Sequence, residues 1–231
     1  MSPRLFNQYD QYLENLLCAQ YNVADIFDHE LAKGESREDF LIRILHDEND
    51  HMKIHKGFLT NGHDQSNQCD LIVCRSGTRT RRIGSQTLID VADQPVLIEV
   101  KGNATGTDFK EFNEKAGRAK ALNPEHDIPC GLFCYKIDLT AQTVLKRFGF
   151  RYEPSKDALG SIYTDDPDDL RPRLPILYPN IDFVICIEPG VAGASGKQLF
   201  LRKNPVSGRY VFNDDTPVIK HMIKMVRSLT L

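Results

Sequence analysis

Two short apolar runs in the first half of the chain each have charged side chains at one end. The run at 71–74 follows Asp70 directly, and a second run leads into Glu99, Val100 and Lys101. Short aliphatic and β-branched runs bounded by polar turns are typical of buried strands. Because side chains alternate along a strand, Glu99 and Lys101 share one face while Val100 points into the core. If the strands are neighbours, Asp70 joins the pair, and two carboxylates and one ammonium meet at a sheet edge.

The same patterns predict the flanking elements. Amphipathic periodicity predicts helices at 5–20, 23–32, 37–46, 108–122, 140–148 and 217–229, with a break at 33–36 where Gly34 ends a helix or makes a turn. Further strands are expected at 53–60, 129–135, 181–188 and 198–202, with an Asn-Gly turn after the first. Polar connections are expected at 75–94, 153–180 and 190–196. This order predicts an α/β fold with a mixed central β-sheet flanked by helices.

Composition narrows the class of protein. The 231 residues, 41% hydrophobic and 26% charged, suit one globular domain over 1–231. No stretch has the apolar length needed to span a bilayer, and the N-terminus lacks a secretory apolar core, so a cytoplasmic location without membrane contact is expected. The net charge of −3 argues against a non-specific DNA coat protein, but a nuclease needs basic residues in one groove only.

The cysteines and histidines are candidate ligands for zinc. Cys130 and Cys134 have no second pair at zinc spacing, and most of the six cysteines sit in or beside apolar runs, which favours core packing. The histidines at 46, 51 and 55 have no accompanying cysteine and are expected at the surface. Core packing of the cysteines and surface exposure of the histidines are therefore favoured over a zinc site.

Asp70, Glu99 and Lys101 suit metal-assisted hydrolysis of a phosphodiester. Two carboxylates make a hard oxygen site for Mg²⁺, which takes its other ligands from water and phosphate. A neighbouring lysine can orient or deprotonate the attacking water. The competing interpretation is a surface salt bridge of little energetic value.

Two groups of basic residues are candidates for contact with nucleic acid. Arg75, Arg79, Arg81 and Arg82 form the densest cluster, and they either bind phosphate or decorate a solvated hairpin tip. Lys110, Lys115, Arg118 and Lys120 follow on the next predicted helix. For these, a solvated face with pairs such as Glu111–Lys115 is the favoured prediction.

The pattern resembles the PD-(D/E)xK restriction-endonuclease-like superfamily. Asp70 matches its first acid, and Glu99-Val100-Lys101 matches the (D/E)xK element; Cys69 stands where the superfamily proline would be. The resemblance implies an αβββαβ core. It also implies catalytic roles for Asp70, Glu99, Lys101 and Glu38, and a metal held by Asp70, Glu99 and the carbonyl of Val100. Gln68, two residues before Asp70 and on the same face of the strand, would support the site.

A closer resemblance runs from about Glu30 to Leu122. It is carried by Ala32-Lys33-Gly34, Glu38, Gly57-Phe58, Ser66-x-Gln68-x-Asp70 and Glu99-Val100-Lys101, and it points to bacterial DNA endonucleases of anti-phage signalling that cyclic trinucleotides activate. It implies DNA cleavage with Mg²⁺, or Mn²⁺ as substitute, a homo-oligomer (dimer or trimer) and a cyclic oligonucleotide activator. Lys33, Arg79, Arg81 and Arg82 join Gln68 as residues near the substrate. The core falls at about 30–135, and the part at about 136–231 diverges from the group.

The resulting prediction is a metal-dependent endodeoxyribonuclease, a hydrolase, acting in bacterial anti-phage defence. The alternative is a catalytically silent binding or regulatory subunit with a nuclease fold, in a defence or DNA-processing complex. A third possibility is a component of a multi-protein complex whose activity appears only on assembly.

Overall fold

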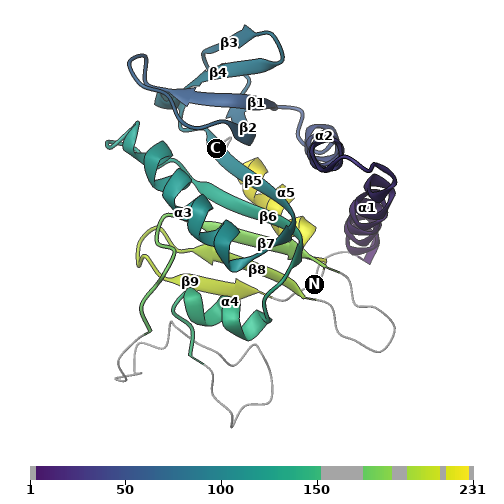
Figure 1. The fold of residues 1–231 in the computed structure, drawn as a ribbon. Helices are drawn as coiled ribbons and strands as arrows, with labels where there is room; N and C mark the ends of the chain where they lie inside the picture. Colours follow the sequence, from purple (N-terminus) through teal and green to yellow (C-terminus); the bar gives the residue numbers. More distant parts are fainter. Residues whose placement is uncertain (1–3, 152–173, 189–196, 214–216, 229–231) are drawn as a thin grey trace.

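The computed structural model describes residues 4–151, 174–188, 197–213 and 217–228. The described chain starts with two helices and continues through five strands. A helix, a strand and a helix come next, and three consecutive strands and a helix follow (Figure 1). The helices are α1 (Arg4–Val23), α2 (Glu30–Asp47), α3 (Gly106–Ala121), α4 (Ala141–Arg147) and α5 (Ile219–Ser228). The strands are β1 (Met52–Thr60), β2 (Cys69–Arg75), β3 (Thr80–Ile83), β4 (Gln86–Asp90), β5 (Val96–Ala104), β6 (Cys130–Ile137), β7 (Phe183–Ile187), β8 (Gln198–Lys203) and β9 (Tyr210–Asn213).

The nine strands of the described residues belong to one sheet, and this sheet is mixed, as predicted. Its order is β3-β4-β1-β2-β5-β6-β7-β8-β9. Pairing is parallel between β5, β6 and β7 and between β1 and β4, and it is antiparallel elsewhere. From α2 to β6 the chain follows the expected αβββαβ order, with the β3–β4 hairpin inserted before β5. The predicted neighbours β2 and β5 do pair, with Leu71 opposite Ile98.

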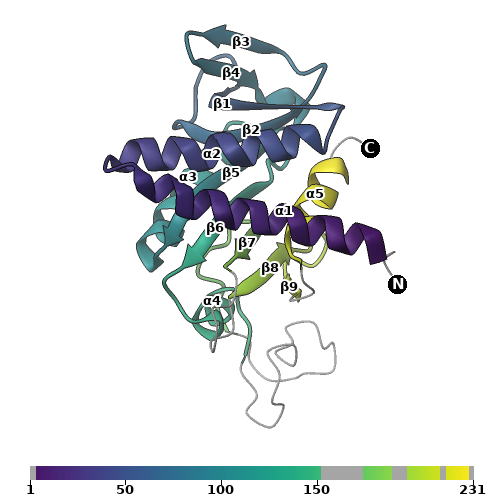
Figure 2. The same cartoon turned by 90° about the vertical axis from the view of Figure 1, so that its right-hand side faces the viewer.

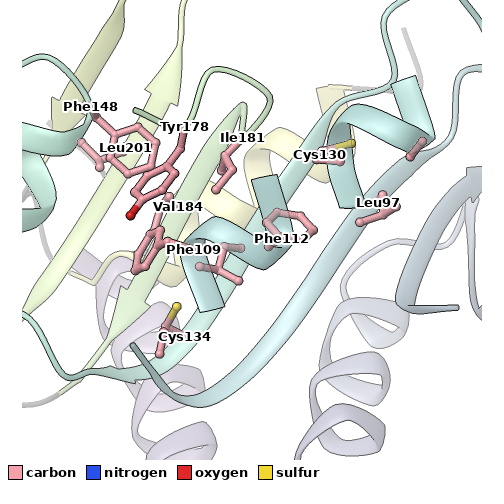
Figure 3. Close-up of a cluster of buried hydrophobic side chains, with 14 of the residues drawn as sticks. Leu97, Phe109, Phe112, Cys130, Cys134, Phe148, Tyr178, Ile181, Val184 and Leu201 are labelled. Carbon is pink, nitrogen blue, oxygen red and sulfur yellow. The ribbon is translucent and has the colours of Figure 1, made fainter. Parts of the chain in front are cut away.

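Helices cover both faces of the sheet. Helices α1, α2 and α5 pack on one face, where α1 and α2 cross the strands side by side (Figure 2). Helices α3 and α4 pack on the other face. There, Phe109 and Phe112 of α3 enter a core with Leu97, Cys130 and Cys134 from the strands (Figure 3). Five of the six cysteines are buried, and all of these lie on the α3 face, which confirms their predicted packing role.

The predicted break at 33–36 is wrong. Helix α2 runs without interruption from Glu30 to Asp47, so Gly34 lies inside it, and the predicted helix over 23–32 is replaced by the end of α1, a 3₁₀ turn and the start of α2. A glycine inside a helix costs about 1 kcal/mol relative to alanine. Burial of Leu41 and Leu45 on the sheet offsets this cost.

Three short strands were not predicted. Strands β3 and β4 form a hairpin in the region expected to be a polar connection, and β9 ends the sheet. These strands have four or five residues each, too few to show a clear alternation. The expected loop at 190–196 lies outside the described residues, as does the expected excursion at 153–180 up to residue 173. No helix among the described residues has both the length and the apolar character needed to cross a bilayer.

Candidate active site

Asp70 lies at an irregularity in the pairing of β1 with β2. From the pair His55–Ile72 to the pair Gly57–Cys69, β2 advances three residues while β1 advances two. An extra residue of this kind is a β-bulge, which bends a strand and redirects its side chains. The Asp70 carboxylate turns to the neighbouring strand β5, where its Oδ2 accepts a hydrogen bond of 2.9 Å from the backbone N–H of Val100.

Strand β5 places Glu99 beside Lys101. The Lys101 Nζ lies 3.1 Å from Glu99 Oε1 and 3.8 Å from Asp108 Oδ1. Asp108 belongs to the first turn of α3, where it forms a reciprocal capping box with Thr105. The turn that follows β5 therefore holds the lysine between two carboxylates, one from the strand and one from the helix.

Lys115 of α3 is a fifth charged group in this cluster, after Asp70, Glu99, Lys101 and Asp108. Its ammonium contacts Oε2 of Glu99, and the two side chains are only 14% and 10% exposed. The prediction of a solvated helix face is therefore wrong for Lys115. Because Phe112 and Ala116 are buried, the adjoining position 115 lies over β5 rather than in solvent. Its place beside the apolar stripe of α3 is the sequence signal that could have identified it.

Arg118, which is exposed, and Lys120, which is half-buried, also have specific partners. Arg118 donates from Nε to Oδ1 of Asn67 at 2.9 Å. Lys120 lies 2.7 Å from Asp182 and also contacts Asp127. These pairs leave Lys110 as the exposed lysine that fits the predicted solvated face.

The acid pair is incompletely neutralised. Burial raises the pKa of the Asp70 carboxyl to about 6, and repulsion from Glu99 adds to the shift. The Val100 N–H and the Lys115 ammonium oppose it. Burial also disfavours the charged form of Lys101, but Glu99, Asp70 and Asp108 outweigh it and raise the pKa of Lys101. Lys101 is therefore an ammonium at neutral pH.

Glu38 lies near the cluster but has its own partner. Its Oε2 is 2.8 Å from Lys56 Nζ, and Lys56 also contacts Asp39 at 2.7 Å. Lys56 lies in β1 opposite the bulge that carries Asp70. The charge of Glu38 contributes to the raised pKa of Asp70, so the two acids interact through space.

The structure places the remaining candidates farther out. Gln68 is exposed just before β2, and Lys33 pairs with Glu30 at 2.8 Å on α2. Arg81 and Arg82 are exposed on β3, the outermost strand, with β4, β1 and β2 between them and β5. Arg79 precedes that strand, and its backbone N–H donates to Asp93.

A cavity of about 280 Å³ opens beside the cluster, between β5 and α3. Glu99, Lys101 and Lys115 line it, and Arg118 lies on its wall with Asn67. A larger cavity of about 520 Å³ lies at the start of β5 and β6, lined in part by Asp182 and Arg202. Lys120 and Lys203 neutralise Asp182 there. The smaller cavity therefore holds the better candidate chemistry.

The donor set fits a hard divalent cation. Asp70 and Glu99 offer carboxylate oxygens, and Val100 offers a backbone carbonyl on the same strand. Magnesium is commonly held by one or two carboxylates and completes its shell with water and phosphate oxygens. Within the ranges that the structure describes, no three His, Cys, Asp or Glu side chains gather as a complete metal cage. A cation held by two carboxylates and a carbonyl would keep coordination positions for water and phosphate oxygens.

Comparison with known proteins rests on structure. No protein-family model matches the sequence, and a search of curated proteins finds no match. NucC of P. aeruginosa ATCC27853 in its cAAA-bound form superposes with a TM-score of 0.69 at 15% identity, covering 97% of this chain and 90% of that one. NucC of E. coli MS115-1 gives 0.67 at 14% identity in its cAAA-bound form, covering 100% and 92%. Its apo form gives 0.61 at 13% identity, covering 97% and 91%.

The likeness extends over nearly the whole chain, although few residues are identical. The expected fold class is therefore confirmed. The divergence from the group expected at about 136–231 stays a prediction. The chain has the restriction-endonuclease-like α/β fold of the NucC structures.

Proposed function

We propose that this chain is a divalent-cation-dependent DNA endonuclease of anti-phage defence. In this proposal Asp70, Glu99 and the carbonyl of Val100 hold Mg²⁺, for which Mn²⁺ can substitute. The observation that carries the proposal is the meeting of Asp70, Glu99 and Lys101 from two paired strands, beside an open cavity. The NucC fold supports it, because these strands lie within the part of the chain that superposes.

A bound cation would polarise a phosphoryl oxygen and lower the pKa of a water ligand. Lys101, held as an ammonium between Glu99 and Asp108, would donate hydrogen bonds to the attacking water and to the phosphate. In the reaction the water oxygen would bond to phosphorus and the bond to the leaving sugar oxygen would break. One proton of the water would end on the leaving oxygen, by way of solvent, and the other would stay with the new phosphate group. Glu38 would not contact the cation. It would act by holding the side chain of Lys56, which lies in β1 opposite the bulge that carries Asp70.

DNA would reach the site through the cavity between β5 and α3. Lys101, Lys115 and Arg118 on its walls would contact the phosphates. The walls also carry acids, namely Glu99, Asp108, Glu111 and Glu114. We propose that Arg79, Arg81 and Arg82 contact the backbone away from the cleaved bond, since they lie on the exposed outer hairpin. Gln68, as a residue that supports the site, and Lys33, as a residue near the substrate, stay predictions.

We further propose that the chain forms a homo-oligomer, dimer or trimer, and that a cyclic oligonucleotide activates it. The support is that two of the similar NucC structures are named as cAAA-bound forms. Measuring the mass in solution with and without cAAA tests both points. A monomer that does not respond to cAAA would contradict this part of the proposal and leave the metal site standing.

The decisive assay is plasmid cleavage with Mg²⁺ or Mn²⁺, with and without cAAA. Wild type and the control Asp47→Asn, an exposed acid at the end of α2, should cleave. Asp70→Asn and added EDTA should each reduce cleavage at least about 100-fold. Cleavage by Asp70→Asn at the wild-type rate would refute the assignment. A wild type that binds DNA under all these conditions without cleaving it would favour the silent binding subunit.

A further inference from the structure

Glu99 has a different ammonium on each of its two oxygens. Lys101 takes Oε1 and Lys115 takes Oε2. Lys101 also reaches Asp108, whereas Glu99 is the ion-pair partner found for Lys115 within the described part of the chain. Both oxygens of the acid proposed to bind a cation are therefore already engaged by positive charge.

Lys115 is the more readily displaced of the two ammoniums. Lys101 is also held by Asp108, whereas Lys115 would release Glu99 by moving its flexible stem alone. Helix α3 stays in place, because the Thr105 cap and buried Phe112 fix it. The Lys115 side chain lines the cavity of about 280 Å³, so there is room for the ammonium to leave Glu99 without moving the helix.

We infer that Lys115 is a counter-ion that competes with the divalent cation for Glu99. Without a cation, it stabilises the acid pair. When a cation binds, Lys115 gives up Oε2 and turns into the cavity. Lys115 thereby sets the cation concentration at which the site fills. The inference rests on the proposed function, because it takes Asp70 and Glu99 as the cation site.

The test measures Mn²⁺ binding to the purified full chain without DNA, by calorimetry or by the electron paramagnetic resonance of free Mn²⁺. Lys115→Met should bind Mn²⁺ roughly tenfold more tightly than wild type, because the competing charge is gone. Lys115→Arg keeps the charge and should stay within about twofold of wild type. Lys110→Met, on the exposed face of the same helix, is the matched control and should leave the affinity unchanged.

A second readout comes from thermal unfolding. In EDTA, Lys115→Met should melt below wild type, and saturating Mn²⁺ should close this gap. If Lys115→Met does not fold, Lys115→Gln provides an uncharged polar substitute for both measurements. Unchanged or weaker Mn²⁺ binding by the uncharged variants would overturn the inference while leaving the site intact. Equal Mn²⁺ binding by wild type and Asp70→Asn would overturn the proposed cation site itself, and the inference with it.

Discussion

Asp70 and Glu99 differ in how well their charges are compensated. Glu99 contacts two ammoniums, whereas Asp70 accepts one backbone hydrogen bond and lies close to another acid. An incompletely compensated buried carboxylate destabilises a fold unless a cation binds it. The proposed cation site is therefore a place where stability and activity oppose one another.

Asp70→Asn is expected to raise the free energy of unfolding of the cation-free protein at pH 7 by about 1–3 kcal/mol. The pKa of Asp70 is about 6 in the folded state, against 3.8 for an ordinary aspartate. Between these two pH values the folded state therefore binds more protons than the unfolded chain. Wild type should therefore lose stability as the pH rises from about 4 to about 6. The variant should lack that loss.

Urea unfolding in EDTA across this pH range measures both effects. The pH-dependent difference between the two proteins isolates the Asp70 contribution from other titrating groups. A variant less stable than wild type at pH 7, or an identical pH dependence in the two proteins, would contradict the conclusion that the buried Asp70 charge is incompletely compensated.

The turn from β5 into α3 connects the elements that carry the charged cluster. Lys101 lies near the end of β5, Asp108 in the first turn of α3, and Lys115 farther along the helix. Thr105 fixes the start of α3 by accepting a hydrogen bond from the Asp108 N–H, and its own N–H donates to the Asp108 carboxylate. The position of the helix start therefore determines how the strand and helix charges meet.

Thr105→Ala should cost about 1 kcal/mol of stability and lower cleavage roughly tenfold, because Asp108 loses its partner and no longer holds Lys101 in place. Thr140→Ala is the matched control. Thr140 caps α4 through the Thr143 N–H, in an element that does not contribute to the cluster. It should cost a similar stability and leave cleavage unchanged. Equal loss of cleavage in both variants would show a general effect of destabilisation rather than of positioning.

Which elements the sequence predicts depends on how much of each is buried. Strands β2 and β5 and helix α3 follow from their apolar patterns, and so does the meeting of Asp70 with Glu99. The β-bulge at Asp70 is absent from the predictions, since it arises from pairing with β1. Local spacing predicts that Lys115 faces solvent beside Glu111, whereas the fold places its ammonium against Glu99. The continuity of α2 through Gly34 likewise depends on tertiary burial rather than on local propensity.

Contacts between distant parts of the chain hold the α1, α2 and α5 layer on the sheet. Glu14 of α1 is buried, and its carboxylate accepts from the Ile219 N–H at 3.0 Å, at the start of α5. The Gln198 amide of β8 donates to its other oxygen. Burial raises the pKa of Glu14, and these hydrogen bonds oppose the shift. This one side chain therefore joins the first helix, the last helix and the sheet.

Glu14→Ala is expected to lower the free energy of unfolding by about 2–4 kcal/mol, because it leaves buried donors on two other elements without acceptors. Glu14→Gln keeps one acceptor oxygen and should recover part of the loss. Urea unfolding at pH 7 measures the difference. A loss below about 0.5 kcal/mol for the alanine variant would contradict the role given to Glu14.

The cation site is tested most directly by a crystal soaked in Mn²⁺ and measured for anomalous scattering. We predict one strong anomalous peak in contact with the carboxylates of both Asp70 and Glu99, and its loss in Asp70→Asn. A well-ordered crystal with no peak between these two acids at saturating Mn²⁺, or with its peak at another site, would contradict the account.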